Sequence, residues 1–315
     1  MLIDFIFLLL FFILGVLLGA LKSKIPIYHI KETFSIGIMG GRSPFELKEN
    51  EGNCNPVIKP SDITDFSCRF VADPFLYQYN NKWFILYEAM DMETNRAKIC
   101  WSYSNDFQNW HYKGIAITEN FHLSYPYIFE YNEKIFLIPE TNRKFEVRLY
   151  ECHNFPDKWE CKHVLLRGRY TDPSIIIFNG TWYLFLTETG SSILRLFYSD
   201  KLTKDWIEHP HSPIVVDDKA RARSAGKIIT YENQLYRFSQ DCSNIYGETV
   251  RAHRIIKLNK TEYFEKEYSE NPILEPTGTG WNSHRMHHLH AIEKTPGHWI
   301  AAVDGLSRKR GLFIK

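Results

Sequence analysis

Acidic side chains recur at two fixed places in a repeated pattern. Asp73 and Asp172 each precede a proline at the start of a short apolar run. A second set of acids closes the apolar run that follows each start, and its members are Glu88, Glu140, Glu188, Asp241 and Asp304. Carboxylates crowded into a partly buried place acquire different pKa values, so that a protonated acid and an ionised base coexist near neutral pH. Cleavage of a glycosidic bond needs such a pair.

These acids also have ordinary structural interpretations. An Asp before proline can begin a strand by capping a turn, and one acid at a strand end can be a solvated loop carboxylate. The acids follow the opening of their strands at two different offsets, so some of them should point away from a shared pocket. Their recurrence as a set favours a functional role, and the predicted catalytic residues are Asp73, Asp172, Glu140, Glu188 and Asp241.

A histidine-rich segment, residues 281–290, packs four imidazoles into its last seven positions. In an extended strand the adjacent His287 and His288 cannot both point inward. No cysteine cluster accompanies them, so we prefer ordinary hydrogen-bonding roles to a zinc site. One axial histidine that holds a water or a hard cation is the alternative. We therefore predict no metal or cofactor beyond such a cation near His287 or His288.

Aromatic and cationic residues complete the predicted binding set. Tyrosine and tryptophan rings supply flat walls for sugars, while carboxylates accept hydrogen bonds from sugar hydroxyls. Arginines suit a substrate phosphate or carboxylate, although a salt bridge to a neighbouring acid is an equal alternative. The predicted substrate-binding residues are His122, Tyr125, Glu88, Arg223, Trp281, His287 and His288.

The elements that must position these residues form a fivefold repeat. Each copy is a hairpin with a short apolar strand, a turn rich in Asn or Gly, and a second strand. The copies start near Ala72, Ser124, Thr171, Ala225 and His287. Third strands are expected at 98–104, 146–152 and 194–198, and fourth strands at 110–117 and 159–166. Four strands per unit of roughly 50 residues are typical of a β-propeller.

A ring of sheets explains the pattern better than a two-sheet sandwich, which does not account for the fivefold recurrence. A four-stranded sheet has two apolar faces, and neighbouring sheets can cover both. We predict an all-β fold, a five-bladed β-propeller over residues 25–315. Residues 34–38 should add a strand to the last blade and close the ring. The first strand of every blade would then line one central channel, where the candidate residues converge.

The first 24 residues differ from the rest. Residues 5–21 are apolar and uncharged, about the length of a transmembrane helix. We predict a single-pass membrane anchor; a signal peptide cleaved near Ala20 and a buried helix are the alternatives. Asp4 stands where a signal peptide would carry a basic residue.

The sequence carries only weak signals for the side of the membrane on which the propeller lies. Lys22, Lys24 and Lys31 would hold their side in the cytoplasm. Glycosylation sequons at Asn179 and Asn259, and an even number of cysteines, favour a lumenal or extracellular propeller. Cys152 and Cys161 flank a turn and are either a disulfide or two free thiols. Because 38 basic residues balance 37 acidic ones, nothing favours nucleic acid as a partner.

Several separate motifs resemble one known family. They lie at 34–38, 42–45, 70–75, 121–127, 138–141, 238–242 and 281–288. The chain resembles the N-terminal domain of plant glucosamine inositolphosphorylceramide transferases over residues 34–305. The resemblance implies a five-bladed propeller of the kind found in arabinanases, xylosidases and levansucrases. In the plant enzymes the sugar-transferring domain lies beyond this one, so the transferase activity is not carried over.

Arabinanase-like propellers use an Asp at the start of blade one, an Asp at the start of blade three and a Glu at the start of blade four. Asp73 and Asp172 match the two Asp positions. The position of the blade-four Glu is occupied by the segment Arg223, Ser224 and Ala225. We predict a glycoside hydrolase-like or transglycosylase-like protein that acts on a glycan or glycolipid. The alternative is a non-catalytic module that presents glycan to a partner glycosyltransferase.

Overall fold

The computed structural model describes residues 2–22, 27–49 and 54–313. The chain divides into two compact units, one made of Met1–Glu32 with Arg308–Lys315 and the other of Thr33–Ser307. The first unit contains helix α1 (Leu2–Lys22) and the outer ends of strands β1 and β20. Within the described residues, no helix is both long and apolar enough to cross a membrane. The transmembrane helix predicted at residues 5–21 is therefore not confirmed.

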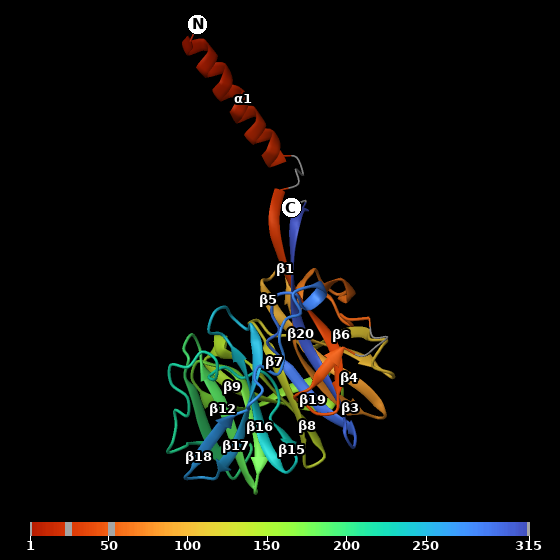
Figure 1. The fold of residues 1–315 in the computed structure, drawn as a ribbon, viewed down its shortest axis with the longest axis vertical. Coiled ribbons are helices and arrows are strands. Elements are labelled where there is room, and N and C mark those ends of the chain that lie inside the picture. The colour runs from red at the N-terminus through yellow and green to blue at the C-terminus, as the bar shows by residue number, and fades with distance from the viewer. Residues whose placement is uncertain (1, 23–26, 50–53, 314–315) are drawn as a thin grey trace. The chain divides into compact units, whose positions relative to one another are not determined.

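The second unit is all β and contains five four-stranded sheets, which confirms the predicted propeller (Figure 1). Blade 1 consists of β3 (Cys68–Tyr79), β4 (Lys82–Asp91), β5 (Arg96–Ser104) and β6 (His111–Ile117). Blade 2 consists of β7 (Ser124–Tyr131), β8 (Lys134–Glu140), β9 (Glu146–Asn154) and β10 (Lys158–Arg167). Blade 3 consists of β11 (Tyr170–Phe178), β12 (Thr181–Glu188), β13 (Leu194–Ser199) and β14 (Ile207–Glu208).

Blades 4 and 5 complete the ring. Blade 4 consists of β15 (Ile229–Tyr231), β16 (Gln234–Asp241), β17 (Thr249–Leu258) and β18 (Tyr263–Glu267). Blade 5 consists of β19 (Leu289–Thr295), β20 (His298–Phe313), β1 (Ile27–Gly41) and β2 (Leu47–Glu49). Three 3₁₀ helices are described, at Pro60–Asp62, Asn142–Lys144 and Gly280–Asn282. The third and fourth strands predicted in blades 1 and 2, and the third in blade 3, are confirmed within a few residues.

The ring closes through strands from both ends of the chain. β1 lies beside β20 in the last sheet, as predicted for residues 34–38. The segment before β15 in blade 4 also meets the start of β19 in blade 5, since the Leu289 amide donates to the Ala225 carbonyl at 2.8 Å. Gly226 is required there because a Cβ would lie 1.8 Å from the Leu289 carbonyl oxygen. Its φ of +136° is also one that glycine adopts without strain.

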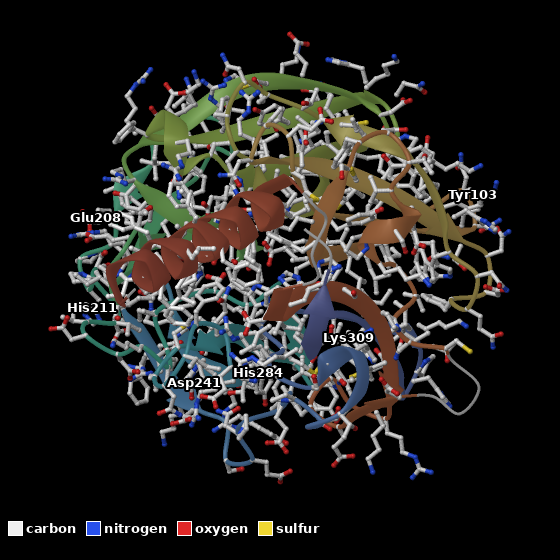
Figure 2. All side chains as sticks on the ribbon, turned by 90° about the horizontal axis from the view of Figure 1, so that it is seen from above. Tyr103, Glu208, His211, Asp241, His284 and Lys309 are labelled. Atoms are coloured by element: carbon white, nitrogen blue, oxygen red, sulfur yellow. The ribbon has the colours of Figure 1, made fainter. Side chains whose placement is uncertain are left out.

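Apolar cores lie between neighbouring blades, as a ring of sheets requires. Ile38 of blade 5 and Ile85 of blade 1 share one cluster, and Leu196 of blade 3 and Leu235 of blade 4 share another. Burial decreases outward from the axis: β4 is buried along most of its length, whereas most of β10 is partly or fully exposed. Seen from above, Tyr103 and Glu208 on third and fourth strands lie at the outer edge (Figure 2). Inward-facing residues of the first two strands therefore build the site.

The structure decides between the two alternatives for Cys152 and Cys161, a disulfide or two free thiols. Cys152 and Cys161 are free thiols, as are the other four cysteines. The hairpin register explains this: Cys152 is opposite Trp159, and Cys161 is opposite Tyr150.

Candidate functional site

Equivalent residues at the start of blades 1, 2 and 3 share a left-handed backbone. Asp73, Tyr125 and Asp172 have φ values of 51°, 47° and 49°, and each lies at a register shift in the first hairpin of its blade. Such a conformation costs on the order of 1–3 kcal/mol in a residue other than glycine. A β-bulge re-aims a side chain. Here the strained bulges turn the three side chains toward buried partners from other blades.

Asp73 is the centre of the resulting cluster. Its Oδ2 accepts a hydrogen bond from the Tyr125 amide at 3.2 Å. Its Oδ1 is buried without a hydrogen-bond partner among the described residues, although His287 Nε2 and His288 Nδ1 lie 3.6 and 3.7 Å away. Burial raises the pKa of Asp73 to about 7; the His287 charge opposes this rise, and the charge of Asp172 adds to it. Asp73 is therefore poised to exchange a proton near neutral pH.

Both histidines reach Asp73, contrary to the expectation that only one could point inward. Residues 286–288 are irregular, and strand β19 begins only at Leu289. The alternation of side chains along a strand therefore does not apply to them. Burial lowers the pKa of His288 to about 3, so this imidazole is neutral. For His287 burial acts in the same direction, but Asp304 outweighs it and the pKa is raised.

Asp304 holds this arrangement in place. Its Oδ1 accepts hydrogen bonds from the His287 and His288 amides, both at 3.1 Å, and from His287 Nδ1 at 2.9 Å. Its Oδ2 accepts a hydrogen bond from the Asp73 amide at 3.1 Å. Burial alone would raise the pKa of Asp304, but His287 and these donors lower it. Asp304 is an ionised anchor that orients both His287 and the Asp73 backbone.

Asp73, His287 and Asp304 bring ligand atoms within 4.8 Å of one another, which makes this group a candidate cation site. Four N–H donors already use the Asp304 oxygens, and His287 Nδ1 is one of those donors. Only Asp73 Oδ1 and His287 Nε2 remain within this group. Hard cations take six to eight oxygen ligands, and zinc takes four ligands in all. Hydrogen bonds within the fold therefore use most of the ligand atoms of this group.

Asp172 forms the second half of the cluster. Its Oδ2 accepts hydrogen bonds from Arg223 Nε at 2.6 Å and Gln240 Nε2 at 3.2 Å. Glu140 lies close to it: burial first, and then the Asp172 charge, raise the Glu140 pKa well above its ordinary value, although Arg223 opposes the shift. Glu140 Oε2 is buried and makes no hydrogen bond within the described residues. Glu140 is thus a protonated acid beside the arginine-bound Asp172.

Glu88 joins the two halves. Burial, followed by the charges of Asp73 and Glu140, raises its pKa well above the ordinary value. His122 Nε2 lies 3.4 Å from Glu88 Oε1. Burial lowers the pKa of His122 to about 4, with Arg143 and Arg69 adding to the effect, so the neutral ring gives Glu88 no opposing charge. We use the name axial cluster for seven of the residues described above: Asp73, Glu88, Glu140, Asp172, Arg223, His287 and Asp304.

The Tyr125 ring lies buried beneath the polar cluster and is not exposed as a flat surface for a sugar. Its side chain is fully buried. Its hydroxyl crosses the axis to blade 4, accepting from the Gly226 amide at 2.8 Å and donating to the Gly226 carbonyl at 2.9 Å. Its ring packs against Phe75 and His288, with centroids 5.0 and 5.4 Å away. The polar cluster is therefore closed beneath by a buried aromatic layer.

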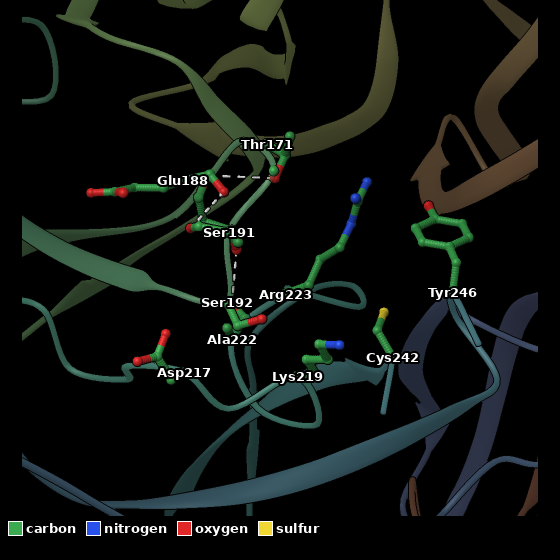
Figure 3. A pocket seen from close by; sticks show the side chains of 12 residues that line it. Thr171, Glu188, Ser191, Ser192, Asp217, Lys219, Ala222, Arg223, Cys242 and Tyr246 are labelled. Atoms are coloured by element: carbon green, nitrogen blue, oxygen red, sulfur yellow. Dashed lines mark hydrogen bonds between the residues drawn. The ribbon is translucent and has the colours of Figure 1, made fainter. Parts of the chain in front are cut away.

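A pocket of about 450 Å³ adjoins the axial cluster between blades 3 and 4 (Figure 3). The loop after β12, the segment before β15 and the loop after β16 line it. Arg223 belongs both to this pocket and to the axial cluster. The Tyr246 ring also lines the pocket, and its centroid lies 4.9 Å from Arg223 Cζ.

Six predicted site residues lie outside the axial cluster as defined. Three of them contact its members, namely His122, Tyr125 and His288. The other three, Glu188, Asp241 and Trp281, have partners elsewhere. Glu188 lines the adjoining pocket, where Arg195 Nε donates to it. Asp241 forms an ion pair with Arg251 at 3.2 Å, and its pKa is lowered because Ser243 and Arg251 outweigh the effect of burial. Trp281 donates to Glu49 at 2.6 Å and packs over Gly37 in blade 5. These contacts give each of the three a structural partner of its own.

Sequence reasoning did not assign site roles to Asp304, Gln240 or Tyr246. Asp304 belonged to the recurring set of strand-end acids, so its position was visible although its anchoring role was not. Gln240 lies one residue before the acid that ends its strand, a place that the repeat could have marked. Tyr246 lies in an irregular loop, and no periodic signal points to it.

Comparison with curated proteins finds long relatives in plants. The glucosamine inositolphosphorylceramide transferase 1 of Oryza sativa subsp. japonica is 36% identical over 298 residues, which cover 87% of this chain and 40% of that protein. The protein of the same name from Arabidopsis thaliana is 33% identical over 298 residues, covering 87% of this chain and 39% of that protein. The chain thus spans about two fifths of the length of these relatives.

Solved structures share the fold at low sequence identity. The catalytic domain of the Coprinopsis cinerea GH62 α-L-arabinofuranosidase superposes with a TM-score of 0.61 at 9% identity, covering 90% of this chain and 98% of that one. The β-1,2-mannobiose phosphorylase of Listeria innocua gives 0.60 at 12% identity, covering 79% and 94%. The propeller therefore has the fold of known glycoside-active proteins. The family model described as "Glucosamine inositolphosphorylceramide transferase 1, N-terminal" matches residues 29–306, and the chain belongs to that family.

Proposed function

We propose that the propeller binds a glycan at the axial cluster and acts on one of its glycosidic bonds, by hydrolysis or by transfer to another acceptor. One observation carries the proposal. Carboxyl groups from blades 1, 2 and 3 converge, and two of their oxygens, Asp73 Oδ1 and Glu140 Oε2, are buried without a hydrogen-bond partner in the described structure. Unpaired buried polar atoms are costly. Sugar hydroxyls and a glycosidic oxygen would satisfy them.

The raised pKa values divide the chemical roles. Glu140 is protonated because burial and Asp172 raise its pKa, so it would donate its proton to the glycosidic oxygen as the bond to the anomeric carbon breaks. Asp73, when ionised, would either attack that carbon or take a proton from a water that attacks it. In both routes the leaving sugar gains the proton that Glu140 loses. The acceptor then supplies the proton that restores the site.

The other members of the cluster hold and orient. Asp172 is fixed by Arg223 and Gln240, and Glu140 lies beside it. Asp304 and His287 position Asp73 from below. In this proposal Arg223 stands where arabinanase-like propellers place their acid on blade four, and Glu140 from blade 2 supplies the proton instead.

The same Arg223 favours a second candidate, a glycan-binding module that presents its ligand to a separate glycosyltransferase. Asp172 and Arg223 neutralise each other at 2.6 Å, as suits binding without proton transfer. The plant relatives named as transferases are more than twice as long as the matched region. Under this reading the axial cluster binds sugar and performs no chemistry.

One experiment separates the two candidates. The purified full chain is incubated with aryl glycosides and an oligosaccharide panel, and turnover and binding are measured in parallel. Asp73→Asn and Glu140→Gln should each reduce turnover by about 10²–10⁴-fold, the usual contribution of general acid–base catalysis. Glu160→Gln, at an exposed site on β10, is the matched control and should leave turnover unchanged.

The outcomes are distinct. Turnover that both axial variants abolish supports the enzyme. Binding without turnover, weakened by Asp73→Asn, supports the presenting module. A wild-type chain that neither binds nor converts any member of the panel overturns both.

A further inference from the structure

The pocket beside the axial cluster has a cationic side. Arg223 forms part of it, with a side chain 30% exposed. Its Nε donates a hydrogen bond to Asp172, but its two Nη groups donate to no acceptor among the described residues. The Tyr246 ring lies against the guanidinium at 4.9 Å. A planar guanidinium fixed at one nitrogen presents a preset pair of donors, the geometry that binds carboxylate or phosphate.

Lys219 is a second cationic side chain in the lining of the pocket. It is exposed, lines the pocket and has no ion pair within the described part of the chain. Its backbone is fixed because the Cys242 amide donates to the Lys219 carbonyl at 3.0 Å. In Figure 3 its amino group points toward Cys242, on the side of the pocket where Tyr246 lies. Ser192 lines the pocket as well, and its hydroxyl has no partner in the described structure.

The acids of the pocket do not cancel these charges. Glu188 is paired with Arg195, which also contacts Glu208. Asp217 is unpaired, but it lies toward the other side of the pocket, away from Tyr246 (Figure 3). Asp172 neutralises part of the Arg223 charge on the axial side. The amino group of Lys219 and the Arg223 Nη groups therefore remain as the uncompensated donors.

We propose that this pocket binds one anionic group, a phosphate monoester or a carboxylate, carried by the glycan whose neighbouring sugar lies at the axial cluster. Arg223 joins the two places, since its Nε contacts Asp172 and its Nη groups face the pocket. Thr171, which lines the pocket, directly precedes Asp172 in the chain. The ligand is thus an acidic glycan, and this identification rests on the proposed glycan-binding function. The anion-binding site itself does not.

The test compares matched ligands on the full chain. Ligand-observed NMR measures binding of glucose, glucose 6-phosphate, glucuronate and inorganic phosphate at low and high salt. The two anionic sugars should bind at least about tenfold more tightly than glucose, and high salt should reduce this preference. Lys219→Met should remove most of the preference, while Lys219→Arg should retain it. Lys266→Met, an exposed lysine on β18, is the matched control and should change nothing.

Failure of the site and failure of the glycan proposal give different results. Equal binding of glucose and glucose 6-phosphate, or a preference that Lys219→Met leaves intact, overturns the anion site while glycan binding stands. Binding of inorganic phosphate that requires Lys219, with no gain from an attached sugar, supports the anion site and counts against the glycan. Absence of binding by all four ligands, and by phosphorylated oligosaccharides, overturns the inference.

Discussion

The propeller contains two buried charged clusters, and the pKa of a buried carboxyl group shifts in opposite directions in the two. Asp73 in the axial cluster and Glu265 in blade 4 are 5% and 7% exposed, so burial is nearly equal. Burial would raise the pKa of both, yet the pKa of Asp73 rises to about 7 whereas that of Glu265 falls to about 2 because Arg237 outweighs burial. The difference therefore comes from the partners and not from the degree of burial.

The blade 4 cluster consists of Glu265, Arg237, Arg221 and Tyr263, and donors reach both oxygens of the Glu265 carboxylate. Arg237 donates to both oxygens of Glu265 at 2.6 Å, Arg221 adds a contact at 3.0 Å, and the Tyr263 hydroxyl donates at 2.6 Å. In the axial cluster Asp73 Oδ1 has no such donor. A satisfied carboxylate holds a fold together, whereas an unsatisfied one keeps an oxygen for a ligand. The comparison separates structural from functional acids.

The largest expected effect tests the blade 4 cluster. Arg237→Met should lower the free energy of unfolding by about 3–5 kcal/mol, because it leaves Glu265 buried without its main counter-ion. Denaturant unfolding followed by tryptophan fluorescence measures this loss. Arg223→Met is the axial counterpart, and its loss should be smaller because that side chain is 30% exposed. A double variant, Arg237→Met with Glu265→Leu, should recover most of the stability. Equal losses of unfolding free energy in Arg237→Met and Arg223→Met would contradict the distinction between structural and functional acids.

The pH dependence of stability should have opposite signs in the two clusters. Glu265 has a folded-state pKa of about 2, below its ordinary 4.5, so its stabilisation is present above pH 4.5 and disappears as the pH falls toward 2. Asp73 has a folded-state pKa of about 7, above its ordinary 3.8. Its ionisation therefore opposes folding increasingly as the pH rises from 3.8 to 7, and fully above 7.

Unfolding measured from pH 3 to pH 8 checks both signs. Glu265→Gln should be destabilised at pH 7 by on the order of 3 kcal/mol, and the loss should shrink at pH 3. Asp73→Asn should be more stable than the wild type at pH 8 by roughly 1–4 kcal/mol and nearly equal to it at pH 4. A destabilised Asp73→Asn variant at pH 8 would show that Asp73 is a structural acid like Glu265.

The sequence predicted the architecture because its signals are local. Turn residues and alternating apolar positions repeat in each blade, and they place Asp73, Glu88, Glu140 and Asp172 at one mouth once the ring is closed. The same repeat could not separate Glu140 from Glu188. Arg195, which binds Glu188, comes from the next strand, where it is opposite Leu186. That partner depends on cross-strand register, which the pattern does not specify.

Irregular backbone accounts for the remaining differences. His287 and His288 both reach Asp73 because the chain before β19 is not extended. Tyr125 lies buried beneath the polar cluster because its bulge directs the hydroxyl across the axis to Gly226. Trp281 lies over Gly37, a contact between residues far apart in the chain. Alternation rules cannot predict positions that depend on bulges and on distant contacts.

The smallest expected effects come from two buried tyrosines, one in each region. Tyr263→Phe removes one donor from Glu265, which keeps Arg237 and Arg221, and should cost about 1–2 kcal/mol. Tyr125→Phe leaves the Gly226 amide without its acceptor and should cost a similar amount. Neither should change glycan affinity by more than about twofold, because both hydroxyls bond within the fold. Thermal unfolding and binding are measured together. If Tyr125→Phe lost glycan affinity with unchanged stability, the hydroxyl would contact ligand, and the buried layer beneath the cluster would belong to the binding site.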